Sequence, residues 1–95
     1  MNMEARIARL RALLSENLVD ALLVTKEENV HYFSGFCGDS TALLVTPERL
    51  LLVTDSRYTE QAAVQAPLYE VVEQRDGLYQ KVAELAADVG IVSLA

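Results

Sequence analysis

The sequence has very little cysteine and histidine, with one of each, Cys37 and His31, among its 95 residues. A single cysteine permits no intramolecular disulfide, which favours a reducing compartment. A structural zinc site needs about four ligands and a catalytic one about three plus water, and neither residue has a neighbour at ligand spacing. We therefore expect no complete metal site and no cofactor within this chain.

Long apolar runs and positive charge are also scarce. No apolar run approaches the roughly 20 residues of a membrane-spanning helix, and the first residues contain no apolar signal-peptide core. The formal net charge of -6 opposes contact with phosphate backbones. We interpret Arg6, Arg9 and Arg11 as the solvated face of a helix. These features predict a cytoplasmic protein whose partner is neither a membrane nor a nucleic acid.

The pattern of apolar residues predicts helices and strands that alternate along the chain. Spacings of three and four residues indicate helices over 3–17, 26–33, 55–66 and 78–89, and short apolar runs indicate strands over 21–25, 41–46, 50–54, 69–73 and 91–94. The three-residue connection 47–49 can join only antiparallel neighbours, so the strands beside it form a hairpin. The fold class is therefore α/β, with a mixed sheet of about five strands flanked by helices.

Particular residues mark the expected ends of these helices. Asn29 and Asp55 are predicted to cap helical turns, because their side chains can accept hydrogen bonds from free backbone N–H groups. Gly35 and Gly90 are predicted to end helices, since glycine adopts the left-handed conformation at little cost. The last strand meets the end of the chain almost at once, which suggests a piece of a longer protein.

The most distinctive stretch covers residues 29–36. The chain has four tyrosines and two phenylalanines, and three of these aromatic residues lie here together with the histidine, directly before Cys37. His31 and Cys37 could form a thiolate pair for nucleophilic catalysis, but a buried cysteine beside a turn histidine is the more economical interpretation. From its residues alone, the chain is an α/β domain with an aromatic turn and no self-sufficient active site.

Two motifs resemble the N-terminal domain of the Xaa-Pro peptidases, the group that contains aminopeptidase P and Xaa-Pro dipeptidase (prolidase). The first motif is NVHYFSGF at residues 29–36, and the second is DSRY at residues 55–58, followed by EQA at residues 60–62. Creatinase shares the same domain. The two motifs occur in order with the predicted hairpin between them, and the resemblance covers most of the chain.

This resemblance implies a fold and a place in a larger protein. The implied fold is creatinase N-terminal-domain-like, with RNase-H-like topology. Residues 1–95 would form a single N-terminal domain of a larger metallopeptidase whose catalytic domain is absent from this chain. That catalytic domain would hold two divalent metal ions, manganese, cobalt or zinc. None of its metal ligands matches a residue of this sequence.

The resemblance also implies partners and candidate residues. The domain would dimerise, contact its own C-terminal catalytic domain and help to complete the pocket in which a neighbouring subunit binds a proline-containing peptide. The candidate residues for this interface are His31, Tyr32, Phe36, Asp39 and Arg57.

Two other interpretations compete with this role. Tyr32 and Phe36 could instead be core anchors, and Arg57 could pair with an acidic neighbour. The alternative function is a peptide- or protein-binding module of the same fold without peptidase activity, which would suit the acidic composition.

Overall fold

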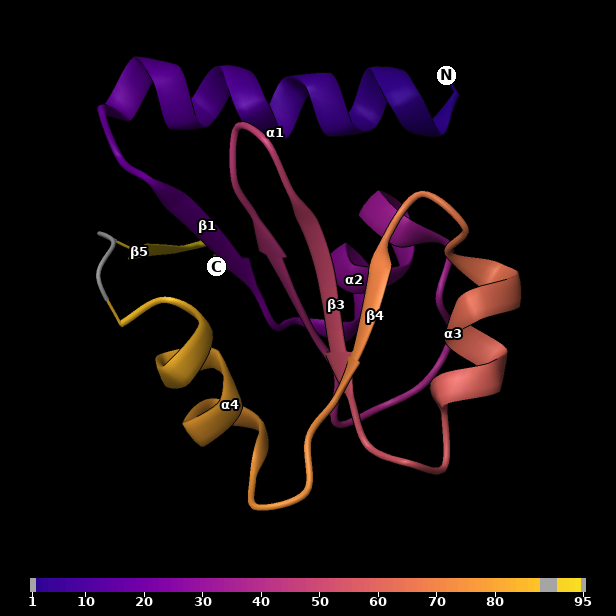
Figure 1. Ribbon diagram of the computed structural model, residues 1–95. Helices are drawn as coiled ribbons and strands as arrows, with labels where there is room; N and C mark the ends of the chain where they lie inside the picture. Colours follow the sequence, from indigo (N-terminus) through magenta and orange to yellow (C-terminus); the bar gives the residue numbers. More distant parts are fainter. Residues whose placement is uncertain (1, 88–90, 95) are drawn as a thin grey trace.

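The computed structural model describes residues 2–87 and 91–94, which form four helices and five strands in the predicted order (Figure 1). The elements are α1 (Met3–Asn17), β1 (Ala21–Val24), α2 (Glu27–Ser34), β2 (Ala42–Val45), β3 (Leu50–Thr54), α3 (Thr59–Gln65), β4 (Glu70–Glu73), α4 (Leu78–Leu85) and β5 (Ile91–Leu94). The prediction of an α/β fold with a mixed sheet is confirmed.

The strands form one sheet in the order β4-β3-β2-β1-β5. β2 is antiparallel to both β1 and β3, while β1 pairs with β5 and β3 pairs with β4 in parallel. The predicted hairpin of β2 and β3 is therefore confirmed, and the Thr46 N–H closes its turn by donating to the Arg49 carbonyl at 2.9 Å. This topology places the carboxyl ends of β1, β3 and β4 at the same edge of the sheet, beside the start of β2.

Helices cover the two faces of the sheet unequally. One face packs against α1, α2 and α3 around a single apolar cluster whose buried members are Ile7, Leu10, Leu14, Leu22, Val24, Val30, Phe36, Leu43, Val45, Leu52, Ala62, Ala66 and Tyr69. On the opposite face, Val82 and Ala86 of the α4 segment pack on strand residues. Figure 1 shows α1 across the top of the sheet, with α3 and α4 on either side of β3 and β4.

Helix α1 follows directly from its sequence pattern. Ile7, Leu10 and Leu14 recur at three- and four-residue spacing and are buried. The Asn2 side chain caps the first turn by accepting from the Ala5 N–H at 2.8 Å. The helix ends at Leu18, which is in the left-handed conformation with φ of 53°.

The expectation that the three arginines of α1 are simply solvated is wrong for two of them. Arg11 donates from Nε to the Thr46 carbonyl at 3.1 Å, and Arg6 donates to the Tyr32 carbonyl at 2.9 Å. Both bonds connect α1 to other elements, so these side chains hold α1 against the hairpin turn and α2.

The helix ends are predicted with mixed success. Gly35 ends α2 as expected, with φ of 90° and its N–H bonded to the His31 carbonyl at 2.8 Å. Asn29 lies inside α2, so the prediction that it caps a helical turn is wrong. The Asp55 side chain accepts from the Arg57 N–H at 3.0 Å as predicted, but a turn separates it from Thr59, so it is not the cap of α3. Gly90 lies outside the described residues.

The burial of Phe36 gives a stability prediction. Its side chain is 1% exposed within the main apolar cluster, so Phe36→Ala should lower the free energy of unfolding by about 3–5 kcal/mol. Urea denaturation measures the change. The control is Val64→Ala on α3, where the side chain is 80% exposed and the expected change is within about 0.5 kcal/mol. Equal effects of the two substitutions would contradict the burial of Phe36 in the core.

Candidate functional site

The candidate site consists of the loop at residues 35–41 and the turn at residues 55–58, which meet near the end of β3 and the start of β2. The Ser34 hydroxyl begins the loop, because it donates back to the Val30 carbonyl and accepts from the Phe36 N–H at 3.1 Å. Gly35 lies against α3, where an added Cβ would come within 2.7 Å of the Gln65 carbonyl oxygen. Three residues of the first motif therefore stabilise the start of the loop: Ser34 by hydrogen bonds, Gly35 by its close approach to α3, and Phe36 by its burial.

The buried Phe36 ring holds the loop against the core. Its ring contacts the Tyr58 ring edge-on, with centroids 5.6 Å apart and an interplanar angle of 82°. Gly38 passes directly over the Phe36 ring, and a Cβ there would lie 2.7 Å from Cζ. A side chain at position 38 would therefore displace the ring or the loop. With Phe36 turned inward, its neighbours Cys37 and Asp39 are exposed.

Helix α3 and the turn before it hold the loop by hydrogen bonds. The Cys37 N–H donates to Oε1 of Gln65 at 2.9 Å, and Nε2 of Gln61 donates to the Cys37 carbonyl. Gln61 also donates to Gln65 at 3.0 Å. The Tyr58 hydroxyl donates to Oδ1 of Asp39 at 2.9 Å, and this bond raises the pKa of Tyr58. The sequence reasoning missed Gln65, whose only signal is its four-residue spacing from Gln61 on α3.

The second motif forms a compact ion pair. Arg57 donates to both carboxylate oxygens of Asp55, at 3.0 Å from Nε and 2.8 Å from a terminal nitrogen. The Arg57 N–H donates to the same carboxylate at 3.0 Å. These bonds hold the pKa of Asp55 below its ordinary value and raise that of Arg57. The interpretation that Arg57 pairs with an acidic neighbour is confirmed, and Asp39 lies 3.7 Å from the same guanidinium.

The structure brings together only some of the five candidate residues. Phe36, Asp39 and Arg57 meet around Tyr58. His31 lies on α2 beside the loop, where it lines a hollow of about 270 Å³ with Cys37.

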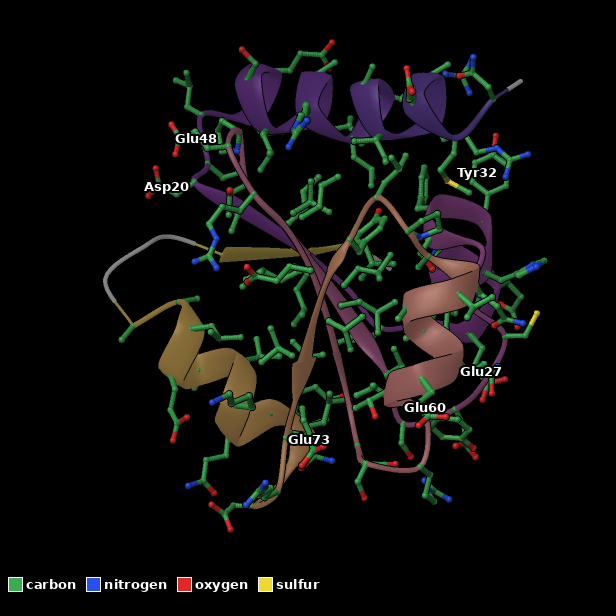
Figure 2. The ribbon with its side chains drawn as sticks, turned by 45° about the vertical axis from the view of Figure 1, so that its right-hand side comes forward. Asp20, Glu27, Tyr32, Glu48, Glu60 and Glu73 are labelled. Atoms are coloured by element: carbon green, nitrogen blue, oxygen red, sulfur yellow. The ribbon has the colours of Figure 1, made fainter. Side chains whose placement is uncertain are left out.

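Tyr32 lies apart from this group, at the other end of α2 from Glu27 and beside α1 (Figure 2). Its ring stacks under the Arg6 guanidinium, 4.3 Å from the centroid, and it is 38% exposed. Tyr32 is therefore a partly exposed side chain at the α1–α2 contact, while Phe36 is the core anchor.

The chemistry available in the described residues is limited. The expectation of a buried cysteine is wrong, because Cys37 is exposed. Among the described residues, no group of three or more histidine, cysteine, aspartate or glutamate side chains could hold a metal ion. No helix in the described part of the chain has the length and hydropathy to cross a membrane.

Comparison with known families agrees with this geometry. The chain belongs to the creatinase/prolidase N-terminal domain family, whose pattern matches residues 6–94. The match includes both motifs and all five strands of the sheet. The structural neighbours are also domains of this family, so the fold predicted from the two motifs is confirmed.

Individual relatives show where this domain occurs. The uncharacterized peptidase YqhT of Bacillus subtilis is 34% identical over 89 residues, covering 94% of this chain and 25% of the relative. The Xaa-Pro dipeptidase from Bacillus anthracis superimposes with a TM-score of 0.84 at 33% identity, covering 92% of this chain and 24% of that protein. The chain thus spans about a quarter of the length of these relatives.

A solved N-terminal domain provides a third comparison. The N-terminal domain of the cytoplasmic peptidase PepQ from Mycobacterium tuberculosis superimposes with a TM-score of 0.83 at 38% identity. This alignment covers 94% of the present chain and 72% of that domain. The chain therefore resembles the N-terminal portion of a peptidase over most of its length.

The ion pair at the second motif gives a pH prediction. Because Arg57 holds the pKa of Asp55 below its ordinary value, the ionised carboxylate stabilises the fold above about pH 4, and this contribution is lost as the pH falls through the folded-state pKa. Asp55→Asn should therefore be less stable than the parent chain near pH 7, and the difference should narrow toward pH 3. Urea denaturation at several pH values measures it.

The matched variant is Arg57→Gln, which removes the other partner of the same pair. Its stability difference from the parent chain should narrow over the same acidic range, because protonating Asp55 breaks the bond in the parent. A difference that is the same at pH 3 and pH 7 for both variants would contradict a stabilising ionised pair.

Proposed function

We propose that this chain is the non-catalytic N-terminal domain of an Xaa-Pro metallopeptidase. The observation that carries the proposal is its likeness to solved N-terminal domains of peptidases over nearly its whole length. The described residues also contain no cluster suited to a metal ion, so they do not fit the metal pair of such an enzyme. Two divalent ions, manganese, cobalt or zinc, would belong to a separate catalytic domain that acts on proline-containing peptides.

The exposed part of the candidate site supports a role in subunit contact. Asp39 and Arg57 are exposed, yet hydrogen bonds hold their side chains, and the buried Phe36 ring anchors the loop that carries Asp39. Fixed charged groups on a surface favour recognition, because little conformational freedom is lost when a partner binds. We propose that this surface, with His31 beside it, meets the substrate pocket of a neighbouring subunit in a homodimer. Phe36 would not contact the partner; its buried ring would fix the conformation of the loop.

The first test concerns catalysis by the chain itself. The 95-residue chain, supplied with manganese, cobalt or zinc, should not hydrolyse an Xaa-Pro dipeptide above the rate in buffer. Release of free proline measures the reaction, with a complete Xaa-Pro dipeptidase as positive control. Stoichiometric, metal-dependent turnover by the purified chain would overturn the assignment of a non-catalytic domain.

The second test locates the subunit contact. Cys37 is exposed in the loop, so a photoactivatable cross-linker attached to it should join subunits of the protein produced from the complete gene, with any other cysteines replaced. The matched control places the only cysteine at Val64, an exposed position on α3. We expect the dimeric product from position 37 and little or none from position 64.

The alternative function gives the opposite result. A peptide- or protein-binding module without a catalytic domain would form no such dimer, or would cross-link equally from both positions. The specific observation that favours this alternative is the net charge of -6, which suits a basic partner.

A further inference from the structure

A second feature of the molecule lies at the edge of the sheet where β1, β3 and β4 end. A cavity of about 430 Å³ opens there, within the size range of small-ligand sites. Its base is formed by residues that directly follow three strands, Thr25 after β1, Asp55 after β3 and Gln74 after β4. The cavity therefore lies beyond the strand ends, where loop residues Gly38, Ser40 and Thr41 also line it.

The topology explains why a cavity forms at this edge. The connection after β1 leads into α2, which packs on one face of the sheet, and the connection after β4 leads into α4, which packs on the other. Helices that leave the same edge toward opposite faces open a crevice between them, and open α/β sheets bind ligands in such crevices. Figure 2 shows Glu27 at the lower end of α2 and Glu73 at the lower end of β4.

The walls of the cavity combine apolar surface with negative charge. Val30 of α2 and Leu78 of α4 line it, and Tyr79 contributes an aromatic side chain that is 67% exposed and takes no part in the core. Glu27 and Asp55 also line it, and none of the lining residues is lysine or arginine. The cavity therefore offers an aliphatic contact, an aromatic face and carboxylate oxygens to one ligand.

The two carboxylates differ in their availability. Asp55 is bonded through both oxygens to Arg57, so its charge is already balanced. The Glu27 side chain makes no hydrogen bond or ion pair with any of the described residues, although it lies in the first turn of α2. Its neighbour Glu28 does not line the cavity and pairs with Lys26 at 3.6 Å. Glu27 is thus the unbalanced charge of the cavity.

We propose that this cavity binds an alkylguanidinium or alkylammonium group, the chemistry of an arginine or lysine side chain in a peptide. The aliphatic stem would lie along Leu78, and the cationic head would pair with Glu27 and face the Tyr79 ring. A free alkylguanidine offers the same chemistry, so the test includes both sources. This inference does not depend on peptidase activity, and no step of its test measures hydrolysis.

The test is a titration of the isotope-labelled 95-residue chain followed by its amide NMR signals. The probes are N-acetylarginine N-methylamide, butylguanidine and the citrulline analogue of the first, which has nearly the same shape without the charge. We expect saturable shifts at Thr25, Ser40, Gln74 and Tyr79 with the arginine probe, and a dissociation constant on the order of a millimolar for a ligand of this size. Equal binding of butylguanidine would identify the free group, and not the peptide backbone, as the recognised chemistry.

Matched variants separate the cavity from general surface attraction. Glu27→Gln should weaken binding of the arginine probe by about two- to fivefold, the range of a partly exposed ion pair, while Glu28→Gln in the same helical turn should leave it unchanged. Tyr79→Ala tests the aromatic wall and should also weaken binding. Thermal unfolding of each variant verifies that the fold is retained.

Three results would overturn the proposal. Equal binding of the citrulline analogue and the arginine probe would show that the charge of the ligand does not matter. Equal weakening by Glu28→Gln and Glu27→Gln would show that binding follows only the acidic surface. The absence of saturable shifts at these residues would show that the cavity binds no such ligand. Each of them leaves the assignment of the domain to a peptidase untouched.

Discussion

The burial of the Phe36 ring constrains everything around the candidate site. Because this ring lies in the main core, the chain must bend at Gly35 to bring it there and pass over it at Gly38 without a side chain. The same bend turns Cys37 and Asp39 outward. A hydrophobic contact in the core thus decides which polar groups the surface displays.

Hydrogen bonds then fix this loop to the segment that carries the second motif. Gln61 and Gln65 hold the backbone of Cys37, and Tyr58 holds Asp39 while its ring packs on Phe36. The two motifs are separated by a hairpin in the sequence but form one structural unit. Each motif therefore supplies contacts that order the other.

The remaining features of the candidate site and the cavity lie at one edge of the sheet, where β1, β3 and β4 end. The Asp55–Arg57 pair, the loop over Phe36 and the cavity between α2 and α4 all lie at strand ends on this edge. Mixed sheets favour such gathering, because parallel strands end on the same side while the antiparallel β2 begins there. The opposite end of the sheet has a structural role, because Arg11 of α1 donates there to the Thr46 carbonyl in the hairpin turn.

The element order, the β2–β3 hairpin and the family could be predicted from the sequence, because apolar spacing, a three-residue connection and two motifs are local signals. For Phe36 and Arg57 it left two interpretations open, an interface role or a place in the core for Phe36, and an interface role or an acidic partner for Arg57. Three features follow from the folded arrangement alone: Cys37 is exposed, Tyr32 lies apart under Arg6, and Gln65 holds the loop. These outcomes depend on contacts between segments about 26 to 28 residues apart, which spacing along one segment does not encode.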